Sequence, residues 1–194
     1  MKKWLFLILL FPLICVAQTY RYLGVEDGLS NRRVYCIQKD KTGYMWFLTH
    51  EGIDRYNGKE FKRYKLMDGD AEVNSLLNLN WLYIDQEGVL WEIGKKGKVF
   101  RYDQIHDCFS LVYKLPMESF SEQPDPVTYA WLDQNKHIWL CNKDTIFLYN
   151  TDTKQVTHIK NDISEEITDI EQIDESHFFI GCLLYTSPSP RDTR

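Results

Sequence analysis

A segment of about 45 residues recurs along this chain, and the recurrence constrains the fold more than any single motif does. The stretch DKTGYMWFLTHEGIDRYNG, residues 40–58, has a counterpart in DQEGVLWEIGKKGKVFRYD, residues 85–103. Aligned in one frame, the copies begin at Val34, Leu79, Val127 and Ile167. Units of this kind cannot bury their apolar faces alone, so they stack on one another.

The first three copies share an Asp, a turn residue, a Trp and, further on, a Tyr. The repeat residues are Asp40, Gly43, Trp46 and Tyr56, then Asp85, Gly88, Trp91 and Tyr102, then Asp133, Trp139 and Tyr149. A weaker fourth copy has Phe179 at the Trp position and Ile173 at the Asp position. Because Lys136 and Ser176 replace the Gly, we expect those two turns to differ in type.

Each unit has the pattern of four short strands separated by turns. In the first unit the expected strands are VYCIQK, YMWFLT, IDRY and FKRYKL. Such runs are rich in β-branched and aromatic residues and end at turn signals such as Thr42-Gly43. The run ITDIEQI in the fourth unit also fits an amphipathic helix, but the repeat favours a strand there.

Four-stranded units with a period of about 40–50 residues predict a β-propeller. The Asp-x-x-Gly segment is expected to form the turn between the first two strands, and the Trp to fill the wedge between sheets. We therefore expect an all-β fold, a β-propeller fragment with three four-stranded blades and part of a fourth. The expected blades are residues 34–78, 79–126 and 127–166, with a partial blade at 167–181.

A leader at residues 18–33 precedes the first blade. Its segment QTYRYLGV has the composition of a strand, which in a closed ring would complete the last blade. Because propellers close with about 4–8 blades, we expect this chain to leave two sheet faces uncovered and to be prone to aggregation.

Residues 1–17 have the pattern of a signal peptide: MKK, then the apolar run WLFLILLF, then PLICVAQ with cleavage after Ala17. An uncleaved anchor is the alternative, and export is expected either way. Residues 182–194 break the repeat. Their CLLYTSPSPRD looks like the translation of a transposon-derived sequencing adapter, so we interpret them as a non-native tail. A natural Pro-rich tail is the alternative.

Composition excludes some classes of protein. The net charge of −5 and the lack of a basic run beyond the first residues argue against a nucleic-acid binder. Export permits disulfides, but the scattered Cys36, Cys108, Cys141 and Cys182 form no framework. We expect Cys36 and Cys141 to be small buried strand residues.

Motifs for catalysis or metal binding do not emerge from the sequence. The five His residues form no HExxH pair, and no G-x-S-x-G segment is present. The acidic run over 162–175 could suggest a glycosidase or a calcium site, but a solvated face is the expected interpretation. We therefore predict no catalytic residues, no metal and no cofactor.

Some residues lie outside the repeat frame. Trp81 and Trp131 could stack on sugar rings, although their apolar surroundings favour the core. His50 and Glu51 do not recur, so any individual function in the first stretch would lie with them. The recurrence of Asp40 and its equivalents indicates a turn role instead.

The motif D-x-x-G-x-x-W, followed by G-x-x-R-Y-N, resembles the two-component regulator propeller repeat, and VEDGLSNRRVYCI with Gly28-Leu29-Ser30 strengthens the match. The resemblance covers residues 20 to about 181. It implies the exported, N-terminal sensor region of a hybrid two-component histidine kinase, on the periplasmic side of the inner membrane. It further implies a glycan-derived ligand, a homodimer in the full-length protein and a kinase outside these residues, so that this region is not an enzyme and contacts no nucleic acid.

Two other functions stay open at this point. The chain could come from a secreted propeller enzyme, such as a polysaccharide lyase or glycosidase, with catalytic residues that occur once at the central opening. It could also come from a non-catalytic interaction scaffold.

Overall fold

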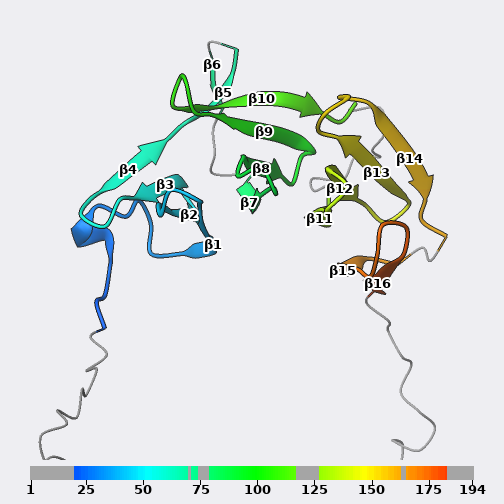
Figure 1. Cartoon of the computed structure of the whole chain (residues 1–194), viewed down its shortest axis with the longest axis horizontal. Helices are drawn as coiled ribbons and strands as arrows, with labels where there is room; N and C mark the ends of the chain where they lie inside the picture. Colours follow the sequence, from blue (N-terminus) through cyan, green and yellow to red (C-terminus); the bar gives the residue numbers. More distant parts are fainter. Residues whose placement is uncertain (1–19, 70, 74–78, 117–126, 163–164, 183–194) are drawn as a thin grey trace, which may run out of the picture.

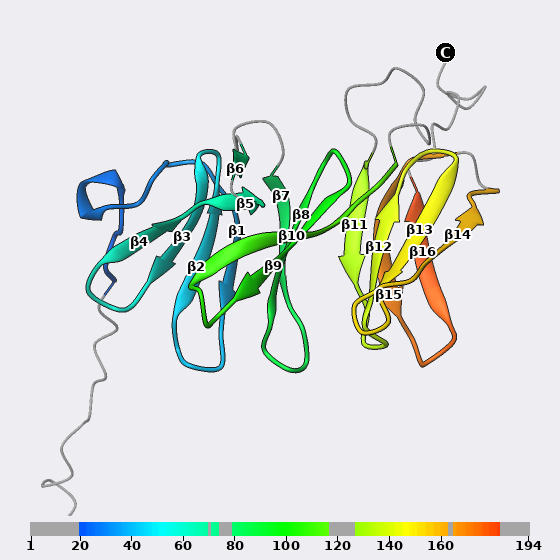
Figure 2. The same ribbon diagram turned by 90° about the horizontal axis from the view of Figure 1, so that it is seen from above.

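The computed structural model describes residues 20–69, 71–73, 79–116, 127–162 and 165–182. These residues form four sheets arranged side by side in an arc (Figure 1), and neighbouring strands within them are antiparallel except for one pair in the second sheet. Seen from above, the four sheets follow one another along the arc (Figure 2). The all-β, propeller-type prediction is therefore confirmed. The expected signal peptide and non-native tail lie outside the described residues, apart from Cys182.

The first and third sheets each have four strands in sequence order, as the repeat predicts. The first contains β1 (Val34–Lys39), β2 (Met45–Thr49), β3 (Gly52–Tyr56) and β4 (Phe61–Tyr64). The third contains β11 (Tyr129–Leu132), β12 (His137–Cys141), β13 (Thr145–Asn150) and β14 (Val156–Lys160). The first strand of each sheet lies on the inner side of the arc (Figure 1).

The second sheet has six strands because two short ones join its outer edge. Its own strands are β7 (Leu79–Ile84), β8 (Leu90–Gly94), β9 (Lys98–Asp103) and β10 (Cys108–Lys114). Strands β5 (Leu66–Asp68) and β6 (Ala71–Val73) form a hairpin, and β5 pairs in parallel with β10. The end of the 34–78 segment, expected in the first blade, thus extends the sheet of the second.

The fourth sheet consists of β15 (Ile167–Gln172) and β16 (Phe178–Cys182). The run ITDIEQI is therefore a strand, since β15 pairs along its length with β16. A helix there would point its apolar residues along one stripe. Successive side chains of β16 instead point to opposite faces of the sheet. Ile180 faces the third sheet, together with Ile170 of β15, and Phe179 faces away from it.

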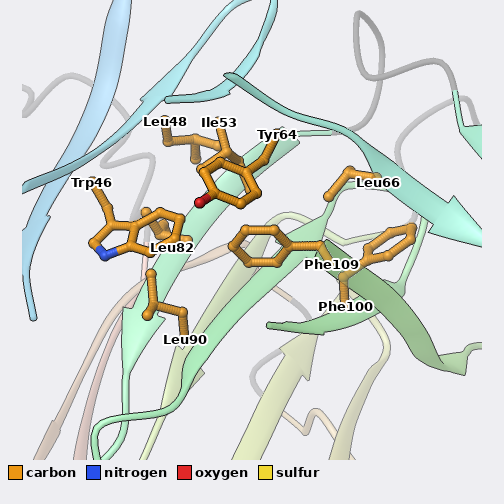
Figure 3. Close-up of a cluster of buried hydrophobic side chains, with 9 residues drawn as sticks. All are labelled: Trp46, Leu48, Ile53, Tyr64, Leu66, Leu82, Leu90, Phe100 and Phe109. Atoms are coloured by element: carbon orange, nitrogen blue, oxygen red, sulfur yellow. The ribbon is translucent and has the colours of Figure 1, made fainter. Parts of the chain in front are cut away.

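The apolar core lies between the sheets, in three separate clusters. Trp46 on β2, which is 1% exposed, packs between the first two sheets with Leu82, Phe100 and Phe109 (Figure 3). Trp91 and Trp139 occupy the next two junctions. Burying a side chain of this size stabilises the fold by roughly 2–3 kcal/mol, so each junction depends on its tryptophan.

The leader does not form the strand expected from QTYRYLGV. Residues 20–24 have no regular structure, and η1 (Val25–Asp27) is a short 3-10 helix. Tyr22 is 93% exposed and packs on none of the core clusters. The Gly28-Leu29-Ser30 segment does dock on the first blade: Leu29 is buried, and the Ser30 backbone N–H and hydroxyl both donate to Asp54 Oδ2.

Glu92 is a buried carboxyl at a position that is apolar in the other sheets. It lies on β8 between Leu82 and Phe100 on the neighbouring strands, is fully buried, and neither carboxylate oxygen has a hydrogen-bond partner. Burial raises the pKa of Glu92 well above its ordinary value, so the fold favours the neutral form of this side chain. The corresponding residues are Phe47, Leu140 and Ile180.

No helix in the described ranges is long and apolar enough to cross a membrane.

Candidate ligand-binding cleft between the first two blades

The turn between β1 and β2 is organised by the side chain of Asp40. Its Oδ1 accepts hydrogen bonds from the backbone N–H groups of Thr42, at 2.9 Å, and Tyr44, at 3.0 Å. Its Oδ2 accepts a 2.7 Å hydrogen bond from the indole Nε1 of Trp46. The carboxylate therefore joins the turn to the tryptophan that fills the junction, a contact that the sequence analysis did not predict.

The same indole bond occurs in the next two blades. Trp91 donates to Asp85 over 2.9 Å, and Trp139 donates to Asp133 over 2.9 Å. In the fourth blade Ile173 stands at the Asp position, and Asp174, one residue later, accepts the turn's backbone hydrogen bonds. The Asp of the repeat thus has a structural role in every copy that keeps its Trp.

The expectation of a different turn at Lys136 is wrong. Gly43 and Gly88 have positive φ values of 94° and 91°, and Lys136 has the same left-handed backbone with a φ of 65°. The Lys136 ammonium group donates to Glu87, at 2.5 Å, and Asp152, at 3.0 Å. These ion pairs, with a bond from the Thr151 N–H to the Lys136 carbonyl, hold a conformation that a non-glycine residue seldom adopts.

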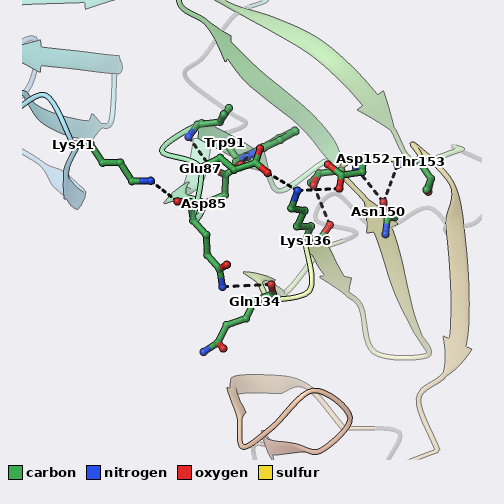
Figure 4. Close-up of polar contacts among 12 residues, drawn as sticks. Lys41, Asp85, Glu87, Trp91, Gln134, Lys136, Asn150, Asp152 and Thr153 are labelled. Carbon is green, nitrogen blue, oxygen red and sulfur yellow. Dashed lines mark hydrogen bonds and ion pairs between the residues drawn. The ribbon is translucent and has the colours of Figure 1, made fainter.

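Neighbouring turns are tied together by side chains that reach from one blade to the next (Figure 4). Lys41 Nζ donates to the Gln86 carbonyl, and Gln86 Nε2 donates to the Gln134 carbonyl over 3.5 Å. Gln134 in turn donates its backbone N–H to Gln172 over 2.9 Å. Lys41, Gln86 and Gln134 occupy one position of the repeat, so the rim of turns is linked along the arc.

A cleft of about 660 Å³ opens at this rim between the first and second blades. Its volume falls within the range typical of small-molecule sites. It is lined by the turns at 40–44 and 87–90, by Trp46 and Arg55 of the first blade, and by residues 101–105 and Asp107 of the second.

Asp107 contacts side chains from both blades of the cleft. Its Oδ1 accepts hydrogen bonds from Tyr64, at 2.7 Å, and Tyr102, at 2.5 Å, and lies 3.5 Å from Arg55. Lys62 donates to its Oδ2. Because Arg55, Lys62 and Tyr64 belong to the first blade, the Asp107 carboxylate joins the two blades at the cleft.

The charges of this cluster are fixed by their surroundings. Burial raises the pKa of Asp107, but hydrogen bonds from Lys62, Tyr102 and Tyr64 outweigh that effect and hold it well below its usual range. Burial and the bond to Asp107 raise the pKa of Tyr102 to about 12. Asp107 is therefore an anion and Tyr102 a neutral donor at physiological pH.

Both arginines of the cleft lining lie close to aromatic rings. The Arg55 guanidinium lies 4.5 Å from the ring centre of Tyr44 and 5.4 Å from that of Trp46. Arg101, at the equivalent position of the second blade, lies 5.9 Å from Trp91. Such a wall offers hydrogen bonds and apolar ring faces to a polar ligand with a flat apolar side.

The structure brings only part of the predicted repeat set to the cleft. Its lining includes Asp40, Trp46, Gly88 and Tyr102. Tyr56 donates to the Gly58 carbonyl over 2.8 Å, and Tyr149 is buried and stacks on Tyr113 at 4.9 Å. The cleft residues that sequence reasoning missed are Arg55 and Asp107. The R-Y pair of the repeat gave a signal for Arg55, whereas nothing local marked Asp107.

His50 and Glu51 lie in the turn between β2 and β3, apart from the cleft lining. His50 Nδ1 is 2.9 Å from the Tyr35 hydroxyl, and Glu51 forms an ion pair with Arg63 at 3.6 Å. Both side chains therefore contact residues of their own blade.

The tryptophan and cysteine residues singled out in the sequence lie in or against the apolar core. Trp81 and Trp131 are half-buried against the second and third core clusters, in agreement with the core interpretation. Cys141 is buried on β12, and Cys36 lies half-buried on β1. In the part of the chain that the structure describes, no three His, Cys, Asp or Glu residues are grouped to hold a metal ion.

Comparison with known proteins agrees with this architecture. Residues 28–51 match the family model described as two component regulator propeller. This segment is therefore similar to a two component regulator propeller repeat. The matched residues run from the docked Gly28-Leu29-Ser30 segment through β1 and β2, including the Asp40–Trp46 hydrogen bond. No curated protein matches the chain.

Solved structures with similar folds include extracellular domains of two-component systems. One, from the hybrid two component system BT3049 of B. thetaiotaomicron, is 27% identical with a TM-score of 0.66; the match covers 84% of this chain and 24% of that one. Another, from the hybrid two component system BT4673 of the same organism, is 20% identical with a TM-score of 0.65, over 86% and 22% of the chains. PorZ, a surface component of the type-IX secretion system of Porphyromonas gingivalis, is 10% identical with a TM-score of 0.52, over 76% and 18%.

The chain therefore spans about a quarter of the length of the two extracellular domains. The one at 27% identity is an extracellular domain of a hybrid two component system, and the other two show the fold alone.

Proposed function

We propose that this chain is the N-terminal part of an exported sensor propeller of a two-component signalling system. The observation that carries the proposal is the coincidence of the matched propeller repeat with an arc of blades similar to the BT3049 extracellular domain. In this role the region binds a ligand and performs no chemistry. The kinase that would transmit the signal lies outside these residues.

The cleft between the first two blades is the part of the described structure best suited to hold a ligand. Its wall combines the half-buried ring of Tyr44 with the guanidinium of Arg101 and the carboxylate of Asp107. Sugars present both hydroxyl groups and apolar ring faces, and such a mixed wall matches both. We infer a glycan-derived ligand from this chemistry.

Ligand binding would act on the junction that the cleft spans. The Asp107 cluster joins the two blades at the cleft, so a ligand that bridges Arg101 and the 40–44 turn would change the angle between the blades. A ligand shifts such an equilibrium only by its difference in affinity for the two arrangements. In the full-length protein we propose that this change reaches a kinase through a homodimer and a membrane span.

Calorimetric titration of the chain with neutral and uronic-acid-containing oligosaccharides tests the ligand class. We expect binding that the substitution Arg101→Ala weakens by roughly 10-fold, since a hydrogen bond to a charged group is lost. His158→Ala, on the outer strand β14, is the matched control and should leave binding unchanged. Failure of every oligosaccharide to bind would contradict the glycan proposal.

The genomic reading frame tests the sensor role separately. A membrane span and a histidine kinase downstream of the repeats are expected. A stop codon directly after the propeller, with no span, would contradict the role. Turnover of a polysaccharide by the chain would favour the alternative of a secreted lyase or glycosidase, which predicts unique acidic residues at the central opening.

A further inference from the structure

The junction between the second and third blades (the second junction) repeats a polar cluster of the first. At the first junction Arg55 lies directly opposite Trp46 on the neighbouring strand. At the second junction Arg101 lies opposite Trp91 in the same way. The guanidinium groups lie 5.4 Å and 5.9 Å from the ring centres of these tryptophans. Directly opposite residues share one face of a sheet, so Arg101, which also lines the cleft, shares the face that Trp91 presents to the third blade.

Two tyrosines occupy equivalent places at both junctions. Tyr64 of the first blade meets Tyr102, the strand-ending tyrosine of the second blade, with 5.8 Å between the ring centres. Tyr113 of the second blade meets Tyr149, the strand-ending tyrosine of the third, at 4.9 Å. At each junction, therefore, one blade contributes an arginine and a tyrosine, and the next contributes a second tyrosine.

The carboxylate that joins this set at the first junction is replaced by a cation at the second. Asp107 and Lys154 each lie 5 residues after the strand-ending tyrosine, and both have positive φ values, of 51° and 59°. At the first junction the Asp107 carboxylate accepts hydrogen bonds from both tyrosine hydroxyls and lies 3.5 Å from the arginine. Lys154 has no acceptor to offer to the equivalent groups.

Arg101, Tyr113 and Tyr149 form a set of donors without an internal acceptor. Among the residues that the structure describes, Arg101 forms no ion pair, and neither tyrosine hydroxyl forms a hydrogen bond. Tyr149 is nonetheless only 1% exposed. Burial raises the pKa of Tyr149, and the positive charge of Arg101 opposes that rise, so the guanidinium lies near the hydroxyl.

Carboxylates in the adjoining turns are already paired. Glu87, before β8, and Asp152, between β13 and β14, both accept hydrogen bonds from the Lys136 ammonium group (Figure 4). Arg101 and Lys154 are exposed. The second junction thus combines two positive charges with two hydroxyl donors, an arrangement that favours the binding of an anion.

We propose that the second junction binds the carboxylate of an external ligand in the place that Asp107 fills at the first. The ligand carboxylate would accept hydrogen bonds from the hydroxyls of Tyr113 and Tyr149 and pair with the Arg101 guanidinium. The chemistry that the site recognises is a carboxylate, carried by an acidic sugar or by a simple organic acid. This site does not depend on the proposed function, because it lies at a different junction from the cleft.

Calorimetric titration of the full chain with D-glucuronate tests the site, and D-glucose, its neutral counterpart, should bind on the order of 10-fold more weakly. Lys154→Asp should weaken glucuronate binding on the order of 10-fold, because the introduced carboxylate occupies the site itself. The same substitution should raise the midpoint of thermal unfolding, since it rebuilds the contacts of Asp107, so the lost binding would not reflect lost folding. Tyr149→Phe, which removes one donor, should weaken binding roughly 5-fold.

Lys143→Asp is the matched control, because it makes the same charge change in the turn between β12 and β13, at the other end of the third blade. Its glucuronate binding should be unchanged. Equal affinity for acetate would assign the site to simple organic acids, and tighter binding of glucuronate would assign it to acidic sugars. No binding of either acid, full glucuronate binding by Lys154→Asp, or an equal loss in both Asp variants would overturn the proposal.

The two proposals fail separately. Neutral oligosaccharides that bind the cleft should bind Lys154→Asp and the unchanged chain equally. A chain that binds glucuronate in a Lys154-dependent way but no neutral oligosaccharide would support the carboxylate site alone.

Discussion

The Oδ2 atom of Asp85 lies 2.9 Å from the indole nitrogen of Trp91, and this hydrogen bond couples two parts of the repeat that sequence patterns treat as separate. The Oδ1 atom of the same carboxylate accepts the backbone N–H of Val89 over 2.8 Å. One side chain therefore closes the turn and fixes the rotamer of the residue that fills the junction with the third blade.

Replacing Asp85 with Ala should destabilise the chain by about 2 kcal/mol, because a charge-assisted bond is lost and the indole N–H loses its acceptor. Asp85→Asn keeps one acceptor oxygen and should cost about half as much. Urea denaturation followed by tryptophan fluorescence measures both. Equal stability of Asp85→Ala and the unchanged chain would refute this role.

Replacing Glu92 with Leu should stabilise the chain at neutral pH by about 1–3 kcal/mol, because a buried unpaired carboxyl gives way to an apolar residue of similar size. The pKa of Glu92 is raised in the folded state, whereas the unfolded chain ionises near the ordinary value of 4.5. The Glu92 contribution to the free energy of unfolding is therefore at its most favourable below pH 4.5. It becomes less favourable as the pH rises above that value, by up to about 1.4 kcal/mol per pH unit.

The free energy of unfolding, measured from pH 4 to 8, checks this dependence. Glu92→Gln is the control, since it keeps the shape but cannot ionise. Both variants should show a flatter pH profile than the unchanged chain. Parallel profiles would mean that Glu92 finds a partner when it ionises.

Replacing Asp107 with Asn should loosen the junction at the cleft. The pKa of Asp107 is lowered in the folded state, so its contribution is present above the ordinary value of 3.8 and is lost as the pH falls through the lowered pKa. Because the side chain is partly exposed, we expect only about 1 kcal/mol. Acid titration of unfolding below pH 4 should be less steep for Asp107→Asn, and an unchanged titration would contradict the assignment.

Replacing Lys136 should separate its two contributions. Lys136→Gly removes the ion pairs with Glu87 and Asp152 but adopts the left-handed backbone without strain. Lys136→Ala removes the same ion pairs and keeps a Cβ, which disfavours that backbone conformation. We expect the midpoint of thermal unfolding to fall for both variants, and further for Ala. The opposite order would show that the backbone conformation at Lys136 carries no strain.

The repeat predicted the fold because its signals are local and recur. A turn Asp, a junction Trp and a strand-ending Tyr each follow from short-range rules of strands and turns, and three copies reduce the ambiguity of any one. ITDIEQI illustrates this, since its own pattern fits a helix and only its place in the repeat marks it as β15.

The features that escaped prediction depend on contacts between units. Lys136 keeps a glycine-like turn through ion pairs with Glu87 of the neighbouring blade, which no local rule includes. The β5–β6 hairpin leaves its own unit for the edge of β10. Asp107 gains its importance from Arg55 and Tyr64, more than forty residues earlier in the chain.

The ties between neighbouring turns have a consequence for how such arrays lengthen. Lys41 and Gln86 each donate to a main-chain carbonyl of the next turn, a group that every residue carries. At the first two junctions the tie therefore requires a long donor side chain on one turn and no particular residue on the next, whereas the third depends on the side chain of Gln172. A repeat unit with a long donor at the Lys41 position can be linked to the turn of the next unit whatever residues that turn contains.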